Sequence, residues 1–542
     1  MMGSQPVVIL KEGTTRERGR SAQSSNIMAA KAVAEAVRST LGPKGMDKML
    51  VDSMGDVVIT NDGATILKEI DVAHPAAKML IEVAKTQETQ VGDGTTSSVV
   101  LAGALLHQAE QLIEDVHPTL ITRGYRLASE RALEIVRGIA REVKFDDEKT
   151  LRYVATTAMS SKSASGQADQ LADITVRAVR AVAEKGSDGR YRVDLGNVSL
   201  IKKTGTSVGQ TELVEGVIVD KERLHPTMPR RVENPKIALI DCPLEIEKPE
   251  IDAKIQITKP HQFQEFIAEE EKILRGYVDR IKSTGANVVF AQKGIDDLAQ
   301  HFLARNGIYA VRRVKESDMK ALARATGGRV VSDLKDLTAD DLGKAGAVEA
   351  RKFGDDELTF VTGATGARAV SVLIRAGTEH VADEVERTLE DALGVVRSVV
   401  EDGKVLPGAG APEIEVALGL RKYAATVGGR EQLAIEAFAD AVETLPRALA
   451  ENAGLDAIDK LVDLRSAHER GQREAGLNVF NGKVENAWEN RVIEPLRVKA
   501  QAIQSATEVA TMILRIDDVI AAKNTSSDSS KGKKGGDSSF DE

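Results

Sequence analysis

The sequence is poor in cysteine and in aromatic residues, and both shortages restrict the kind of protein that it can encode. Cys242 is the only cysteine among 542 residues, so the chain cannot form an internal disulfide, which favours a reducing compartment. Aromatic residues make up only 3 % of the chain, so its hydrophobic cores must consist of alanine, valine, leucine and isoleucine. Residues of this kind suit packed helices and buried parallel strands.

Long apolar segments and an excess of positive charge are missing as well. No segment approaches the roughly 18 apolar residues that a membrane helix needs, and residues 1–13 lack the charged-then-apolar order of a signal peptide. The formal net charge of −10 disfavours contact with nucleic-acid phosphates and with anionic membranes. We therefore expect a cytoplasmic protein that binds no nucleic acid and no membrane.

The chain is instead long, with helical periodicity in its first third. A chain of 542 residues exceeds one compact core, so two or three domains are expected. Residues 21–45 have apolar side chains near helical spacing and stop at a Gly-Pro pair, a combination that ends helices. Residues 56–70 contain two β-rich runs joined by Asn-Asp-Gly at 61–63, which predicts a hairpin.

The middle of the chain alternates between strand and helix patterns. Between residues 236 and 334, short β-rich runs alternate with helical segments, which predicts an α/β domain with a central sheet. Residues 243–281 lie inside this series, and Leu274 and Val278 there follow helical spacing. This charged segment is either an insertion that projects from the domain or a long amphipathic crossover helix.

The helical pattern returns after residue 370. The most economical arrangement is a helical domain built from both chain ends, with the α/β domain inserted as a tip, because chain ends that lie close together tolerate insertion. Residues 524–542 are rich in serine, glycine, lysine and aspartate and have almost no apolar residues. This tail is expected to be disordered.

The clearest candidate for chemistry is the run Val-Gly-Asp-Gly-Thr-Thr-Ser-Ser at residues 91–98, directly ahead of an apolar helix. The first amides of a helix lack partners and lie at the positive end of its dipole, so small residues and hydroxyls there can cradle a phosphate. Asp93 suits such a site if Mg²⁺ lies between the carboxylate and the phosphate. The alternative is an aspartate that caps an ordinary helix. The run is not a P-loop, because no Gly-Lys-Ser/Thr follows.

Four other stretches are weaker candidates, and each has an ordinary explanation. Residues 40–45 form a rigid Gly-Pro turn that could lie over phosphates or only end a helix. Asp62 is either a common turn residue or a carboxylate that orients water or metal. Asp391 follows Glu390 in a helical run, so one of the two could face inward, although a solvated face is usual. The Gly-Ala-Gly turn at 408–410 opens a helix and could pack against a nucleotide sugar or base.

Taken in order along the chain, these stretches resemble the chaperonin family, and the resemblance extends from about Val7 to Lys523. The stretches that carry it are residues 40–50, 59–67, 92–97, 389–396, 408–413 and 492–520. Residues 216–232 and 287–328, with the inserted segment, are most similar to the archaeal and eukaryotic-cytosolic group, and within it to archaeal thermosome subunits.

The resemblance implies a multi-domain α/β fold with three nested domains and a short tail. A helical equatorial domain from both chain ends would hold the ATP site, an intermediate domain would be a hinge, and an inserted α/β apical domain would carry a helical protrusion that acts as a built-in lid. The implied borders are 1–150 and 404–523 for the equatorial domain, 151–217 and 369–403 for the intermediate domain, 218–368 for the apical domain, about 245–282 for the protrusion, and 524–542 for the tail.

The resemblance also gives roles to single residues. Asp62 and Asp391 would position and polarise the attacking water, and Asp93 would bind Mg²⁺. The residues implied to bind the nucleotide are Thr40, Leu41, Gly42, Pro43, Gly94, Thr95, Thr96, Ser97, Lys162, Gly408, Gly410 and Glu494. Among these, Lys162 would sense the γ-phosphate and Glu494 would lie near the ribose. Ala409 departs from the family pattern, which often has a third glycine there.

The function that the resemblance implies is an ATP-dependent chaperone. It would hydrolyse ATP to ADP and phosphate, bind non-native polypeptides, and enclose them in two stacked rings of its own or of paralogous subunits. The alternative is a ring- or filament-forming holdase without productive cycling, but the complete set of Asp62, Asp93 and Asp391 argues against it. A stand-alone metabolic ATPase or kinase would need a second specificity motif, which the sequence does not contain.

Overall fold

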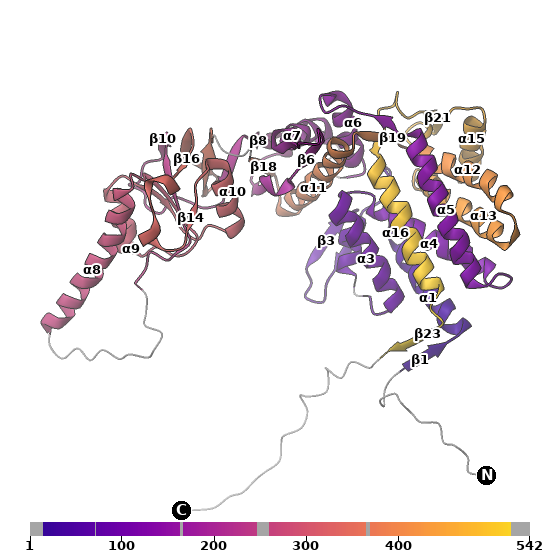
Figure 1. Cartoon of the computed structure of the whole chain (residues 1–542), viewed down its shortest axis with the longest axis horizontal. Helices are drawn as coiled ribbons and strands as arrows, with labels where there is room; N and C mark the ends of the chain where they lie inside the picture. The colour runs from indigo at the N-terminus through magenta and orange to yellow at the C-terminus, as the bar shows by residue number, and fades with distance from the viewer. Residues whose placement is uncertain (1–14, 71, 163–165, 247–259, 365–368, 522–542) are drawn as a thin grey trace, which may run out of the picture.

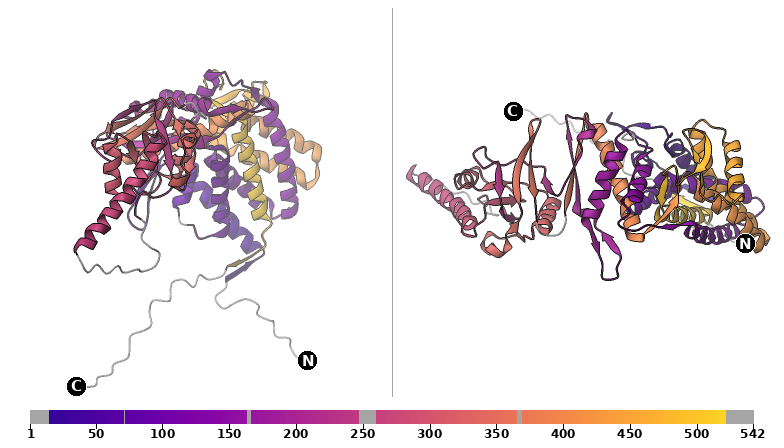
Figure 2. Two further views of the ribbon diagram at one scale, coloured as in Figure 1. Left: turned by 60° about the vertical axis from the view of Figure 1, so that its left-hand side comes forward. Right: turned by 90° about the horizontal axis from the view of Figure 1, so that it is seen from above.

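The computed structural model describes residues 15–70, 72–162, 166–246, 260–364 and 369–521. The molecule is elongated, and it has a helical part at one end, an α/β part at the other and a middle part between them (Figure 1). Seen from above, the three parts follow one another in a row (Figure 2). No helix in these described ranges is long and apolar enough to cross a membrane.

The helical part combines the first and last thirds of the chain. Its central helix, α4 (Thr95–Leu112), is buried without interruption from Val99 to Leu106, so it presents no polar face there. It packs against α1 (Arg20–Arg38), α3 (Pro75–Val91) and α16 (Leu496–Leu514). The strands β1 (Thr15–Arg18) and β23 (Asp518–Ala521) pair in antiparallel fashion, so the two ends of the described chain meet (Figure 1).

The other elements of the helical part surround this bundle. They are β2 (Lys48–Val51), β3 (Val57–Thr60), α2 (Gly63–Glu69), α5 (Pro118–Ile139), β4 (Arg141–Glu142), β19 (Lys404–Pro407), α12 (Ala411–Val427), α13 (Gly429–Val442), α14 (Thr444–Asn452), α15 (Ala457–Glu469), β20 (Ala475–Asn478), β21 (Lys483–Asn486) and β22 (Ile493–Pro495). The hydroxyl of Tyr125 on α5 donates to the carbonyl of Leu105 on α4 (2.7 Å), so even the buried polar atom of this aromatic residue is satisfied.

The predicted hairpin at residues 61–63 is wrong. The hairpin forms one turn earlier, between β2 and β3, where the Asp52 carboxylate accepts hydrogen bonds from the Met54 and Asp56 amides (2.8 Å each). Asp62 instead caps α2, because its carboxylate accepts from the Thr65 amide (2.8 Å). Asn-Asp-Gly suits a hairpin turn and a helix start equally, and the burial of one helical face of α2 decides for the helix.

The middle part contains three helices and two small sheets, one of three strands and one of two. The helices are α6 (Glu148–Met159), α7 (Ala168–Val182) and α11 (Glu379–Asp402), and the strands are β5 (Ala183–Lys185), β6 (Tyr191–Val193), β7 (Val198–Thr204), β8 (Glu212–Val214) and β18 (Val370–Ala376). β18 pairs with β7 in parallel and with β8 in antiparallel fashion, and it leads directly into α11. This part therefore joins chain segments from before and after the α/β part.

The α/β part has the central sheet that the sequence predicts. Parallel strands lie in the order β13 (Tyr309–Val311), β12 (Val288–Ala291), β11 (Lys236–Ile240), β14 (Val330–Val331), and β15 (Gly343–Lys344) joins β11 in antiparallel fashion. Helices α9 (Asp297–Arg305) and α10 (Glu316–Thr326) connect these strands. A second, antiparallel sheet has the order β10 (Arg231–Glu233), β16 (Ala347–Phe353), β17 (Asp356–Thr362), β9 (Gly216–Val219).

Helix α8 (Pro260–Ser283) combines the two alternatives that the sequence leaves open. Leu274 and Val278 are buried against the α/β core, as in a crossover helix between β11 and β12. Its first turns project from the molecule, and Phe266 and Ile267 there are 42 % and 45 % exposed (Figure 1). Residues 247–259 of the predicted protrusion and the predicted tail lie outside the described residues, as does the side chain of Phe263.

Candidate functional site

A cavity of about 970 Å³ lies between the helical part and the middle part. All but one of the residues singled out from the sequence line it, although they come from stretches hundreds of residues apart. They are Thr40, Leu41, Gly42, Pro43, Asp62, Asp93, Gly94, Thr95, Thr96, Ser97, Lys162, Asp391, Gly410 and Glu494. The fold therefore gathers these stretches around a single space.

One wall of the cavity is the N-terminus of α4. Gly94 is the residue before the helix, in the left-handed conformation (φ 79°), and no side chain caps the helix there. The amides that begin α4, at Thr95, Thr96 and Ser97, thus point toward the cavity at the positive end of the helix dipole. A methyl group on Gly94 would lie 2.7 Å from the Val498 side chain, so this position has no room for a larger residue.

Asp93 does not cap α4, which removes the ordinary explanation for it. One carboxylate oxygen accepts from the Gly94 amide (2.6 Å), and no lysine or arginine of the described residues forms an ion pair with it. Burial raises the pKa of Asp93, although this hydrogen bond and the charge of Lys162 oppose the shift. A half-buried carboxylate without a cation, beside the unpartnered amides of a helix start, is a donor set that suits Mg²⁺.

The loop at residues 40–43 closes the cavity above the N-terminus of α4. α1 ends at Arg38, and Asn452 on α14 holds the loop by donating to the carbonyls of Arg38 (3.0 Å) and Leu41 (2.9 Å). Gly42 is in the left-handed conformation (φ 81°), and a methyl group on Gly45 would lie 2.2 Å from a carbonyl oxygen of the loop. This tight turn exposes backbone to the cavity.

Asp391 reaches the cavity because α11 lies directly on the turn between α3 and α4. A methyl group on Gly394 would lie 2.9 Å from the Val91 carbonyl oxygen and 3.0 Å from the Gly92 Cα, so two glycines allow this approach. Asp391 precedes Gly394 by one turn and lines the cavity, whereas Glu390 is exposed. Of the two adjacent acidic residues, Asp391 is therefore the one that faces inward.

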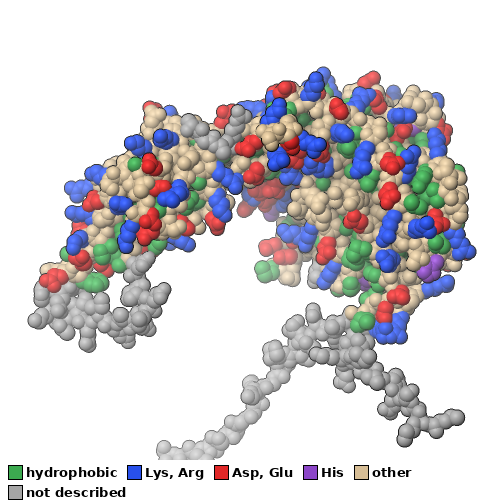
Figure 3. All heavy atoms as spheres, in the orientation of Figure 1, with side chains coloured by type: hydrophobic (Ala, Val, Ile, Leu, Met, Phe, Trp, Pro, Cys, Tyr) green, Lys and Arg blue, Asp and Glu red, His purple; other side chains and the backbone are tan. Residues whose placement is uncertain are grey.

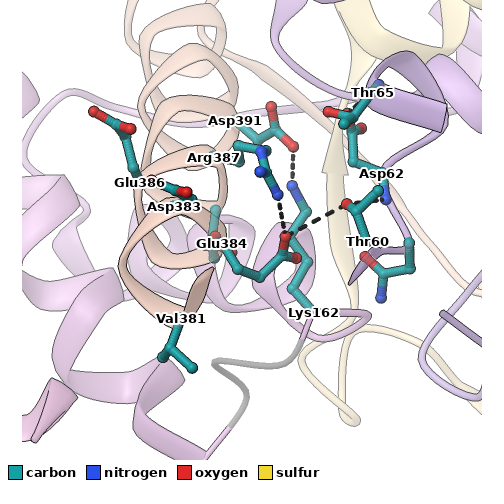
Figure 4. A network of polar contacts seen from close by, with 12 residues as sticks. Thr60, Asp62, Thr65, Lys162, Val381, Asp383, Glu384, Glu386, Arg387 and Asp391 are labelled. Carbon is teal, nitrogen blue, oxygen red and sulfur yellow. Dashed lines mark hydrogen bonds and ion pairs between the residues drawn. The ribbon is translucent and has the colours of Figure 1, made fainter. Parts of the chain in front are cut away.

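Lys162 forms an ion pair with Asp391 inside the cavity (Figure 4). Burial raises the pKa of the Asp391 carboxyl well above its ordinary value, although the Lys162 ammonium opposes the shift. Burial alone would lower the pKa of Lys162, but Asp391 and Asp62 outweigh it and raise this pKa. The lysine therefore carries its charge, and it favours the ionised form of the carboxylate that it contacts.

Asp62 lies near the N-terminus of α4, on the side of α2. One of its carboxylate oxygens accepts from the amide and the hydroxyl of Thr65 (2.8 Å each), which fixes the side chain at the start of α2. A methyl group on Gly63 would lie 2.5 Å from the Thr96 hydroxyl, so the starts of α2 and α4 are in close contact. Figure 4 shows Asp62 on the opposite side of Lys162 from Asp391.

The far end of the cavity is formed by α12, β22 and α16. Gly410 precedes α12 in the left-handed conformation (φ 84°), and Glu494 lies on β22. Gly408 is the one predicted residue that does not line the cavity, because it lies behind Glu494: a methyl group there would be 2.9 Å from the Glu494 carboxylate. Burial raises the pKa of Glu494, with the neighbouring Lys499 opposing the shift.

Lys499 and Glu413 are cavity residues that sequence reasoning missed. The Lys499 ammonium contacts the carboxylates of Glu413 (2.6 Å) and Glu494 (2.9 Å). A signal was present, since Lys499 lies on the same helical stripe as Ile503 and Ala506, which are buried. A lysine in an apolar stripe needs a carboxylate partner, but its partner Glu413 is 86 residues earlier and cannot be identified from spacing.

Comparisons with known proteins agree on one family. Residues 33–524 match the TCP-1/cpn60 chaperonin family. The chain is 60 % identical over 533 residues to the thermosome subunit beta of Archaeoglobus fulgidus, with 98 % of each chain covered. It is 60 % identical over 521 residues to a thermosome subunit of Methanopyrus kandleri, which covers 96 % of this chain and 95 % of the relative.

A solved structure gives the same result for the fold. The open-state monomer of a group II chaperonin from Methanococcoides burtonii matches with a TM-score of 0.60 and 47 % sequence identity. The match covers 79 % of this chain and all of that chain. The fold class predicted from the sequence is therefore confirmed.

Proposed function

The chain belongs to the TCP-1/cpn60 chaperonin family, and we propose that the cavity between its helical and middle parts is the site at which it binds and hydrolyses ATP. The protein is an ATP-dependent group II chaperonin subunit, and thus an ATPase that assists protein folding. It assembles with other subunits and binds substrate proteins. The observation that carries the proposed site is the convergence of Asp62, Asp93 and Asp391 on the start of α4.

The start of α4 would hold the phosphates of ATP. The amides and hydroxyls of Thr95, Thr96 and Ser97 donate to phosphate oxygens, and the loop at residues 40–43 lies along them. Asp93, which has no cation partner among the described residues, would hold Mg²⁺ together with phosphate oxygens. When bound, the ion neutralises charge on the phosphates and on the carboxylate. Gly410 and Glu494 would contact the nucleoside, and Gly408 would support Glu494 from behind.

Asp62 and Asp391 would prepare the water that attacks the γ-phosphate. As the water oxygen bonds to phosphorus, its proton passes to a carboxylate and the bridging oxygen leaves with ADP. Asp62 is fixed by Thr65, so it can orient the water, and the Lys162 ammonium favours the ionised form of Asp391. Lys162 contacts Asp391 directly, so it would also respond to the γ-phosphate by dividing its charge between the phosphate and Asp391.

Hydrolysis would be coupled to movement because the two carboxylates belong to different parts of the chain. Asp62 lies in the predicted equatorial domain and Asp391 in the predicted intermediate domain. The site is complete only when these parts are close, so closure of a hinge would permit turnover and product release would permit opening. The domain borders at residues 150, 217, 368 and 403 are part of this proposal.

We further propose the setting in which this subunit works. The subunits would form two stacked rings, from copies of this chain or from paralogues, and the projecting part of α8 would belong to a built-in lid. The single cysteine of the sequence favours a reducing compartment, and the location that we propose is the cytoplasm. A holdase that binds proteins without cycling is not favoured, because the chain retains the complete carboxylate set.

Substitution of the two carboxylates tests the proposed site. Asp62→Ala and Asp391→Ala should each lower kcat for ATP hydrolysis at least 100-fold, in the range expected when a positioned proton acceptor is lost. The exposed Asp355→Ala is a matched control that should keep full activity. Refolding of a denatured model enzyme should need ATP and fail with both cavity variants. Full ATPase activity in either variant would show that the water is activated elsewhere.

A further inference from the structure

Glu384 is a buried carboxylate of α11 that the proposed reaction does not use. It precedes Asp391 by seven residues, which is two helical turns, so both side chains leave the same face of the helix. Glu384 is 6 % exposed, and it does not line the cavity. A carboxylate this deep needs partners, and two are present.

The partners of Glu384 come from its own helix and from the start of the site. Its Oε2 atom accepts from the Arg387 guanidinium (2.7 Å) and from the Thr60 hydroxyl (3.4 Å). Thr60 is the last residue of β3 and is 2 % exposed. Figure 4 shows Glu384 reaching from α11 toward Thr60, while Arg387 lies above it on the same helix.

Thr60 passes this contact on to Asp62. Its hydroxyl oxygen accepts from the Asp62 amide (3.1 Å) while its hydrogen is donated to Glu384. The order of donors is therefore consistent from the Asp62 amide through the Thr60 hydroxyl to the Glu384 carboxylate. Because its hydrogen is directed to the Glu384 carboxylate, the Thr60 hydroxyl has its lone pairs free to accept from the Asp62 amide.

These contacts connect the two elements that carry the carboxylates Asp62 and Asp391. Asp391 is held by α11, Asp62 is held at the end of β3, and the Thr60–Glu384 contact joins these elements across 324 residues of sequence. An ordinary ion pair of neighbouring turns, such as Glu384 with Arg387, would stabilise α11 alone. Of the two contacts of Glu384, the one with Thr60 reaches the segment that carries Asp62.

We propose that Glu384, held by Arg387 and linked through Thr60, is a positioning residue that sets the location of Asp62 relative to Asp391. This inference rests on the proposed roles of these two aspartates. Glu384 and Thr60 touch neither nucleotide nor water in it. Loss of the link therefore lowers the rate of hydrolysis and leaves the binding of ATP unchanged.

Substitutions of Thr60 separate positioning from stability. Thr60→Val removes the hydroxyl at nearly constant shape and should lower kcat at least tenfold with KM for ATP within about twofold, because a small misplacement of a catalytic group is costly. Thr60→Ser keeps the hydroxyl and should restore most of the rate. Glu384→Gln should lower kcat less than Thr60→Val, since an amide oxygen still accepts. The exposed Glu379→Gln, on the same helix, is the matched control.

A double-mutant cycle tests whether the two residues act together. Thr60→Val combined with Glu384→Gln should lower kcat no further than Thr60→Val alone, because both remove one link. Additive losses, a KM that rises with the fall in kcat, or equal defects in Thr60→Ser and Thr60→Val would overturn the proposal. If Thr60→Val does not fold, Thr60→Ser and Glu384→Gln decide it, since unchanged kcat in Glu384→Gln would refute the link.

The outcome is distinguishable from failure of the proposed site. If Asp62→Ala and Asp391→Ala keep full ATPase activity, the site assignment fails and the link has no function in hydrolysis. If both of those variants are inactive while Thr60→Val hydrolyses ATP at the wild-type rate, the site stands and only the positioning role of Glu384 is refuted.

Discussion

At the scale of single residues, Lys162 influences the ionisation of two carboxylates in the cavity. It forms the ion pair with Asp391, and its charge also opposes the upward pKa shift of Asp93. Without it, a buried carboxylate would be left with no cation, which favours the protonated form. A protonated Asp391 cannot accept a proton from water, so the lysine is needed for the chemistry as well as for packing.

Replacement of Lys162 should change the pH dependence of hydrolysis. In Lys162→Met the pKa of Asp391 rises further, so the carboxylate is protonated up to a higher pH and the acid limb of kcat moves upward by about one pH unit or more. The measurement is kcat for ATP against pH at saturating ATP. The exposed Lys144→Met is the control and should keep the wild-type profile. An acid limb at the same pH in Lys162→Met would contradict the proposed influence of the lysine on Asp391.

Ala409 shows how one residue can depart from a family pattern. Its φ of 57° lies in the left-handed region, which costs a residue with a Cβ atom about 1–2 kcal/mol. The methyl group is accommodated because it packs on Gly476, where a Cβ atom would lie only 2.8 Å away. The structure thus identifies Gly476 as the residue that makes room for the alanine.

At the scale of elements, a buried carboxylate joins the α13–α14 junction to α12 and α15 in the helical part. Glu443, between α13 and α14, accepts from Arg421 on α12 (2.8 and 2.7 Å) and from the Nε of Arg465 on α15 (2.8 Å). Its side chain is 2 % exposed. Burial alone would raise the pKa of Glu443, but the hydrogen bonds from Arg421 and Arg465 outweigh it and lower this pKa below the ordinary value.

The Glu443 contacts should make the helical part sensitive to acid. A lowered pKa means that the stabilisation is present above the unfolded pKa of about 4.5 and is lost as the pH falls through the folded value. Glu443→Gln should cost about 2–3 kcal/mol near pH 7, less than a fully buried pair because both arginines are partly exposed. Denaturant midpoints from pH 7 to pH 3 measure both effects. Equal acid sensitivity in the variant and the wild type would contradict this role.

Elements were predictable from the sequence where pattern and burial agree, and less so elsewhere. The strands of the α/β part follow from local pattern alone. The structure of residues 61–63 was not predictable, because the Asn-Asp-Gly run suits both a hairpin turn and a helix start. The cavity residues were recognised as an ordered series of motifs, whereas Thr60 and Glu384 were missed because their contact spans 324 residues. A pair so distant leaves no periodic signal in either segment.

At the scale of the whole molecule, the α/β part is joined to the rest by a short route from the cavity. β18 pairs with β7, leads into α11, and so connects the inserted part directly to the helix that carries Asp391. Lys203 on β7 contacts Asp220 (3.0 Å) and Asp356 (2.8 Å) across this junction. Partly exposed ion pairs contribute little and exchange readily, so the junction suits movement. On the side of the molecule that Figure 3 shows, lysine and arginine side chains are mixed with aspartate and glutamate side chains.

The α/β part also has the features of an independent unit. Two of its clusters of buried side chains lie entirely between Val217 and Val361, one on each face of the central sheet. The chain enters at Gly216 and leaves at Thr362, which are paired neighbours on β9 and β17. Because the entry and exit points are adjacent, the rest of the chain can fold without disruption by the inserted part. A small apolar cluster crosses the junction, in which Ile218, Leu358 and Phe360 of the α/β part pack with Leu373 of β18.

Residues 216–364, produced alone, should therefore fold. We expect a single cooperative thermal transition by circular dichroism and dispersed amide signals in the nuclear magnetic resonance spectrum, because the core on each face of the central sheet is complete within the fragment. Addition of ATP should leave its Tm unchanged, whereas ATP should raise the Tm of the full chain, since a ligand stabilises only the state that binds it. A fragment without a cooperative transition would show that this part needs β18 and α11 to fold, and an ATP-dependent Tm in the fragment would place a nucleotide site outside the cavity. Either result would change how we connect the cavity to the projecting helix α8. If the fragment does not fold alone, movement of α8 with ATP would require local unfolding, because the α/β part could not move as a folded unit about its two connecting strands.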